Sequence, residues 1–158
     1  MNPLQPLMAL LAQTERERDQ AWGEAQRAAQ AQQDAAARAE QLIVYRREYE
    51  QRWSSQFKIE GRIELLHCYR GFMERLSQAL EQQQRIAEHA QAQLERARAT
   101  LAEHELRVAS VRKLIERRRQ ELRLSADRIE QKQTDEFGSR MHWGTATMAA
   151  GVGLPRAA

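Results

Sequence analysis

The chain has 158 residues, 30% of them charged, and a mean hydropathy of -0.78. Strong helix formers (Glu, Gln, Arg, Ala and Leu) dominate, while β-branched and aromatic residues are scarce, which excludes a sheet protein and predicts one all-α domain. The 25 basic and 22 acidic residues are interspersed, so the net charge of +3 indicates solvated helix surfaces and argues against a nucleic-acid-binding protein.

The N-terminal segment lacks the features of a targeting signal. Residues 1–12 hold an apolar run of only about six residues without a basic leader, so we expect neither a signal peptide nor a membrane span. The single cysteine, Cys68, excludes an internal disulfide and favours a reducing compartment. We therefore expect a cytoplasmic protein with no direct membrane insertion.

Two long helical segments follow in chain order. From Leu7 to about Trp53 there is no Pro and the only Gly is Gly23, so we expect a helix over about residues 4–54. Ser55, Ile59 and Gly61 indicate a turn over about residues 55–61. Only Gly71 interrupts the next segment, which predicts a second helix over about residues 62–137.

The second helix carries a 3.5-residue apolar repeat, the signature of a left-handed coiled coil. Much of the apolar content is Ala, which predicts a thin, elongated core. The two helices are therefore predicted to form an antiparallel coiled-coil hairpin. Alternate steps of three and four residues give Leu66, Tyr69, Met73, Leu76, Leu80, Gln83, Ala87, Ala90, Leu94, Ala97, Leu101, His104, Val108, Val111, Ile115, Arg118 and Leu122.

The first helix has a weaker apolar stripe, and a turn near residue 58 pairs positions whose numbers total about 118. The second helix then overhangs beyond about residue 118, and a flexible tail is expected over residues 141–158 because Gly and small residues abound there. The expected stripe comprises Leu4, Met8, Leu11, Trp22, Ala25, Ala29, Ala36, Ala39 and Ile43, and then Leu42, Tyr45, Tyr49, Trp53 and Phe57.

No residue pattern in the chain predicts catalysis, a cofactor or a metal. The four histidines have no metal-ligand spacing, and there is no phosphate-binding loop, nucleophile elbow or acid/base pair. His104 lies on the core stripe, where it would fix the helix register or, alternatively, form a pH-sensitive joint. We expect neither a catalytic residue nor a cofactor or metal site.

Two surfaces are candidates for protein binding. Phe72, Leu76, Ala79 and Gln83 would present an exposed edge for docking, unless the aromatic residues near the turn cap the hairpin there. Residues 107–128 hold eight basic and three acidic side chains. This basic stretch would bind an acidic protein, nucleic acid or anionic lipid, or would simply be a solvated face.

Three segments resemble the flagellar export protein FliJ family: LIVYRREYEQR from Leu42, YRGFMERLSQALEQQ from Tyr69 and RIEQKQTDEFGSR from Arg128. The resemblance covers about residues 1–140. It implies a soluble component of the flagellar type III protein export apparatus, shaped like the stalk subunit of rotary ATPases and peripherally associated with the inner membrane at the flagellar base. Its implied partners are the hexameric export ATPase, the export gate membrane protein and export chaperones, with no nucleic acid.

The resemblance also implies two binding sites. Phe72, Leu76, Ala79 and Gln83 would bind the export gate, although Gln83 stands where some relatives have histidine. Both chain ends would enter the ATPase ring. The implied ring-binding residues are Leu4, Met8, Leu11, Arg118, Arg128, Gln131, Lys132, Asp135, Glu136 and Phe137.

Other protein classes remain as alternatives. A prefoldin-like holdase would carry apolar residues at the free ends of both helices, whereas the largest aromatic cluster here is near the predicted turn. A homodimeric coiled-coil scaffold is a further alternative. A DNA-binding coiled coil ranks lowest, because the basic stretch also carries the core positions Val108, Val111 and Ile115.

Overall fold

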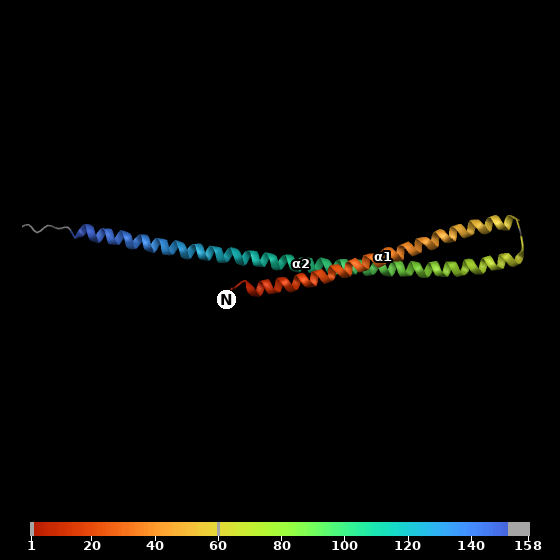
Figure 1. Ribbon diagram of the computed structural model, residues 1–158, viewed down its shortest axis with the longest axis horizontal. Coiled ribbons are helices and arrows are strands. Elements are labelled where there is room, and N and C mark those ends of the chain that lie inside the picture. The colour runs from red at the N-terminus through yellow and green to blue at the C-terminus, as the bar shows by residue number, and fades with distance from the viewer. Residues whose placement is uncertain (1, 60, 152–158) are drawn as a thin grey trace, which may run out of the picture. The chain divides into compact units, whose positions relative to one another are not determined.

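The computed structural model describes residues 2–59 and 61–151 and consists of two helices (Figure 1). Helix α1 spans Gln5–Ile59 and helix α2 spans Ile63–Ala150. The described residues contain no strand, so the all-α class predicted from the abundance of helix formers is confirmed.

Contacts divide the chain into two compact units. The hairpin unit comprises residues 11–109, which include most of α1 and the first half of α2. The terminal unit comprises the first ten residues together with the part of α2 that begins at Ser110.

Polar groups cap the start of α1. The Asn2 side-chain oxygen accepts a hydrogen bond from the Leu4 amide at 3.1 Å, and the Asn2 carbonyl accepts one from Gln5. Pro6 is tolerated in the first turn because an amide there has no acceptor within the helix. These interactions fix where α1 begins.

The turn between the helices is shorter than predicted. Helix α1 continues to Ile59, through most of the predicted turn at 55–61, and Gly61 lies outside both helices. Ser55 is accommodated within the helix because its hydroxyl donates to the Gln51 carbonyl at 3.1 Å. Residue 60 lies outside the described residues.

Helix α2 is longer than predicted. It ends at Ala150, whereas the predicted helix ended near 137 and the tail was expected from 141. Gly138 and Gly144 each lower helix propensity by about 1 kcal/mol, but the Ala and Met residues around them favour helix. Residues 152–158 of the predicted tail lie outside the described residues, and the division of the chain at 140 stays a prediction.

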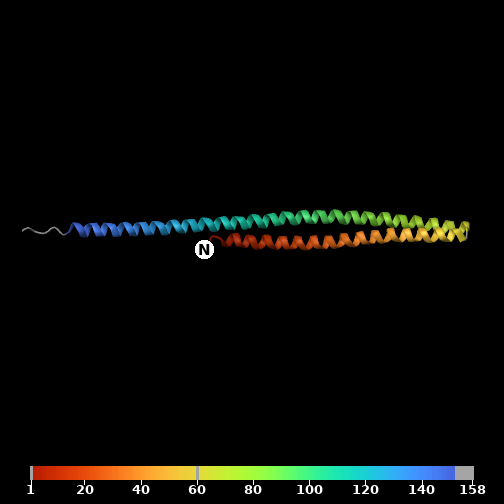
Figure 2. The ribbon, with the colours of Figure 1, turned by 90° about the horizontal axis from the view of Figure 1, so that it is seen from above.

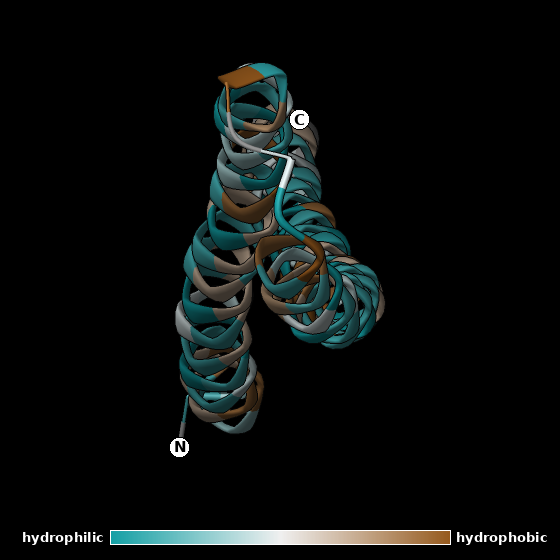
Figure 3. Cartoon of the chain, turned by 90° about the vertical axis from the view of Figure 1, so that its right-hand side faces the viewer, coloured by the Kyte–Doolittle hydropathy of each residue, from teal (hydrophilic) through white to brown (hydrophobic). Residues whose placement is uncertain are grey.

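The core of the hairpin unit is a narrow stripe between antiparallel helices (Figure 2). Most turns of the ribbon are hydrophilic in Figure 3, and none of the described large side chains is completely buried. The buried α2 residues all belong to the predicted stripe, whereas its members Leu66 and Arg118 are exposed. An antiparallel coiled-coil hairpin with a thin core is observed, as predicted. The buried residues are Thr14, Ala21, Ala25, Ala35 and Ala39 of α1 and Leu76, Leu80, Leu94 and Val108 of α2.

The predicted stripe of α1 is partly wrong. Trp22 is 56% exposed and Ala36 is exposed, while the preceding residues Ala21 and Ala35 are buried. Two neighbouring heptad phases are both rich in Ala here, so apolar periodicity alone does not separate them. Met8, in the terminal unit, is also 50% exposed.

The helix register differs slightly from the prediction. Glu17 lies near His104, and Tyr49 packs on Phe72, so the numbers of facing residues total 121 and not 118. The difference follows from the late end of α1, which places the midpoint of the turn one or two residues further along the chain.

Candidate protein-binding surfaces

Aromatic side chains join the two helices close to the turn. The ring centroids of Tyr49 and Phe72 are 4.3 Å apart, and those of Trp53 and Tyr69 are 5.3 Å apart. Each such pair stabilises the packing by about 0.5–1.5 kcal/mol beyond the area it buries. The α1 members are spaced four residues apart, which places them on one face of the helix. They are Tyr45, Tyr49, Trp53 and Phe57.

The predicted exposed edge on α2 is only partly exposed. Leu76 is buried in the core, with 7% exposure, and the amide nitrogen of Gln83 is also buried. Phe72 is half-buried against Tyr49, which is the capping arrangement that the sequence left open. Only Ala79 is exposed. The edge prediction is therefore wrong for Leu76 and Gln83, because both occupy heptad core positions.

Gln83 and His104 are polar residues at core positions of α2 in the hairpin unit. His104 lies at the predicted core position, and its Nδ1 is 3.9 Å from the Glu17 carboxylate. The buried atoms Gln83 Nε2 and His104 Nδ1 have no hydrogen-bond partner among the described residues. Such polar layers fix coiled-coil register at a cost in stability, and this role of His104 stays a prediction.

In the terminal unit, α2 is covered only over its first turns. Ile115 is 5% exposed, and Val111 and Leu122 are half-buried, as is Leu4 near the N-terminus. The last part of α2 is drawn in blue in Figure 1. After Leu122, every α2 side chain that the structure describes is exposed. The predicted overhang is therefore present as an unpaired helix.

The structure places most of the predicted ring-binding residues in the terminal unit. Leu4 is half-buried and Met8 is half-exposed, whereas Leu11 belongs to the hairpin unit and is half-buried there. Arg118 forms an ion pair with Glu121 at 2.9 Å. The members on α2 are all exposed: Arg118, Arg128, Gln131, Lys132, Asp135, Glu136 and Phe137.

An apolar row follows one face of the unpaired helix. At 100° per residue its members fall within about 120° of arc, which is the width of a helix-docking face. An open hollow of about 550 Å³ lies along this row between Phe137 and Met148. Phe137 is 65% exposed and Met141 61% exposed. We call this the overhang row: Leu122, Ile129, Phe137, Met141 and Met148.

Basic side chains are concentrated where the unpaired helix begins. Residues 112–128 hold seven basic and three acidic side chains, and all of them are exposed. Positive potential of this kind attracts acidic proteins, nucleic acids and anionic lipids. The arrangement does not distinguish among these partners.

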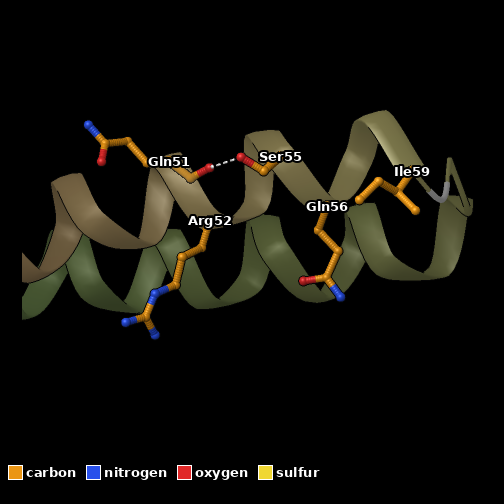
Figure 4. A pocket seen from close by; sticks show the side chains of 5 residues that line it. All are labelled: Gln51, Arg52, Ser55, Gln56 and Ile59. Carbon is orange, nitrogen blue, oxygen red and sulfur yellow. Dashed lines mark hydrogen bonds between the residues drawn. The ribbon is translucent and has the colours of Figure 1, made fainter.

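The surface hollow near the turn is open and lies on α1 alone. Gln51, Arg52, Ser55, Gln56 and Ile59 line it, and their side chains point in different directions (Figure 4). Within residues 2–59 and 61–151 no group of acidic, His and Cys side chains is arranged to hold a metal. No described helix combines the length and hydrophobicity that a membrane span requires.

Two antiparallel helices with a thin core and a long unpaired extension define a coiled-coil hairpin protein. A family model described as "Flagellar FliJ protein" matches residues 2–147. The chain therefore belongs to the FliJ family, whose members are non-catalytic components associated with flagellar type III protein export. No curated protein and no solved structure matches the chain.

The sequence interpretation missed part of both surfaces. Met141 and Met148 were assigned to the tail, although their spacing from Phe137 continues the apolar row along a helix. Ile86, which is 46% exposed, lies seven residues beyond Ala79 and outside the predicted edge. In both cases the apolar repeat continues for one more heptad, beyond Phe137 and beyond Ala79, and this continuation is the signal in the sequence that indicates these residues.

Proposed function

We propose that this chain is the stalk-like component of flagellar type III protein export. In this role it binds the hexameric export ATPase ring and promotes ring assembly and ATP hydrolysis. It also links the ring to the export gate membrane protein and to substrate chaperones. The protein contributes no catalytic group, and it acts in the cytoplasm, peripherally associated with the inner membrane at the flagellar base.

The observation that carries the ATPase part of this proposal is the unpaired helix of the terminal unit. An isolated amphipathic helix in water is only marginally stable, and large exposed apolar rows usually mark binding surfaces. Phe137 and Met141 expose more than half of their side chains on this helix. A ring that encloses the helix would bury the overhang row.

Charged residues around the overhang row would orient the unpaired helix relative to its partner. Basic side chains dominate residues 112–123, whereas Glu130, Asp135 and Glu136 add acidic groups further along. Exposed charges of this kind contribute little stability within the chain but guide association with a complementary partner. We therefore expect ring binding to weaken as the salt concentration rises.

The gate part of the proposal depends on Phe72, Leu76, Ala79 and Gln83. Of these, Ala79 and the outer part of Phe72 are accessible to a partner. Leu76 is buried between the helices, so it holds this part of α2 against α1 and thereby supports the surface formed by Phe72 and Ala79. Ala79 and Phe72 are therefore the proposed contact residues, and Leu76 and Gln83 act through the shape of the hairpin.

The test measures ATP turnover and hexamer formation by the cognate export ATPase. Intact protein should raise both, and a version truncated after Arg117 should lose the effect because it lacks the unpaired helix. The matched control is truncation after Arg140, which retains every proposed ring-binding residue. Absence of stimulation by the intact protein would contradict the proposal. Equal stimulation of the ATPase by both truncated proteins would show that the ATPase contact lies outside the overhang.

A second candidate function is a holdase of the prefoldin type. The observation that favours it is the exposure of Met141, Trp143 and Met148 near the end of α2, together with Met8 at the start of α1. Exposed apolar side chains at free helix ends can hold unfolded chains. Suppression of aggregation of an unrelated unfolded protein, at an equimolar ratio and without the ATPase, would support this alternative.

A further inference from the structure

Apolar residues at seven-residue spacing follow one side of α2 from the proposed gate site. Phe72, Ala79 and Ile86 are spaced seven residues apart, so they lie on the same side of the helix, next to the core. Ala79 is exposed and Ile86 is 46% exposed. The distance from Phe72 to Ile86 along the helix is about 21 Å. The accessible surface therefore extends well beyond the four proposed gate residues.

Helix α1 forms the opposite wall of the same flank. Tyr45 is 45% exposed, and its ring centroid is 6.4 Å from that of Phe72. Two heptads before Tyr45, Ala31 lines a hollow of about 370 Å³ together with Ile86 and Ala90. Because alanines leave the space beside Ile86 unfilled, the flank can receive an apolar side chain from outside.

The border of this flank is mainly basic. Arg38 lines the hollow on the α1 side, and Arg85 and His89 lie beside Ile86 on the α2 side. Asp34 is the acidic residue lining the hollow, and it accepts a hydrogen bond from Gln30 at 3.0 Å. Neither Arg38 nor Arg85 forms an ion pair with a described residue. A partner with acidic borders would pair with these guanidinium groups.

We propose that the gate-binding surface extends along this flank to Ile86 and that its occupant is an amphipathic helix of the export gate membrane protein. The inference rests on the proposed function. A helix is the fitting shape because the row repeats every seven residues and small side chains at Ala31 and Ala79 allow close approach of a third helix. The apolar face of the occupant meets Phe72 and Ile86, and acidic residues on its border meet Arg38 and Arg85.

The experiment measures the dissociation constant between the full chain and the purified soluble cytoplasmic domain of the cognate gate protein. Ile86→Glu should weaken binding about tenfold or more, because it places a carboxylate in an apolar contact. The matched control is Gln84→Glu, which adds the same charge about 200° around the helix from Ile86. The control should bind within about twofold of the unchanged protein, since exposed substitutions change binding little.

Two further variants separate the possible outcomes. Ala79→Glu tests the proposed gate site itself, and Ile86→Gln removes the apolar side chain without adding charge. Circular dichroism establishes that each variant keeps the helix content and melting temperature of the unchanged protein. Arg85→Glu should weaken binding and reduce its dependence on salt.

Each pattern of results decides the inference. Loss of binding for Ala79→Glu with unchanged binding for Ile86→Glu would overturn the extension and leave the proposed gate site standing. Equal weakening by Ile86→Glu and Gln84→Glu would overturn it as well, since the effect would be one of charge alone. Absence of binding by the unchanged protein would refute the gate function, and the extension with it.

Discussion

Replacing Gln83 by Leu should stabilise the hairpin unit. Gln83 occupies a core position of α2, and its side-chain nitrogen is buried without a hydrogen-bond partner among the described residues. Folding therefore removes this amide from water without replacing the hydrogen bonds that it made there. Leucine has a similar volume, fits the repeat of Leu76 and Leu80, and leaves no polar atom to satisfy.

The size of the effect follows from the unsatisfied donor. A buried polar group without a hydrogen-bond partner costs about 1–3 kcal/mol of stability. Because Gln83 is only half-buried, we expect its cost to lie in the lower part of this range. We expect the free energy of unfolding to rise by about 1–2 kcal/mol. For a chain of this length, each kcal/mol raises the melting temperature by about 2–4 °C.

Thermal unfolding followed by circular dichroism at 222 nm measures the change. The control is Gln84→Leu, an identical substitution at the adjacent exposed position, which should alter stability by less than about 0.5 kcal/mol. Because both variants gain the same helix propensity, their difference isolates burial. A melting temperature for Gln83→Leu at or below that of the control would refute the reasoning.

Three more predictions test the core and the surfaces. Val108→Ala should destabilise the protein by about 1–2 kcal/mol because Val108 is 2% exposed, whereas Leu106→Ala should have little effect because Leu106 is 69% exposed; urea unfolding measures both. Phe137→Ala should leave the melting temperature within about 1 °C but lower stimulation of the export ATPase. Leu124 is 57% exposed on another face of the helix, and Leu124→Ala should not lower the stimulation. Cys68 is exposed, so a maleimide should label it completely in the folded protein; labelling that requires denaturant would contradict this placement.

The fold was largely predictable because large apolar residues mark the core of α2. Leu76, Leu80, Leu94 and Val108 follow one heptad phase, and shifting that phase would expose several of them at once. The same repeat predicted a facing helix, and the predicted turn between the two helical segments made that helix antiparallel. The unpaired extension followed from the unequal lengths of the two helical segments.

The phase of α1 was harder to predict because its core is made of alanines. Burying Ala21 in place of Trp22 leaves a large apolar side chain exposed, yet small side chains in the α1 core allow the two helix backbones to approach closely. Local composition does not contain this information, which depends on the shape of the facing helix. The same limit applies to the turn, because Ser55 is as compatible with a helix as with a loop.

The binding surfaces were least predictable because position in the heptad decides exposure, whereas the resemblance assigns residues by alignment alone. Leu76 and Gln83 share a segment with Ala79 but occupy core positions, so Leu76 is buried and the amide nitrogen of Gln83 is turned into the core. By contrast, residues flanking the core, such as Ala79 and Ile86, are accessible in the folded state. It follows that substitutions at Leu76 change gate binding through hairpin stability, and substitutions at Ile86 change it through contact. Measuring affinity and melting temperature on the same variants therefore separates the two kinds of residue.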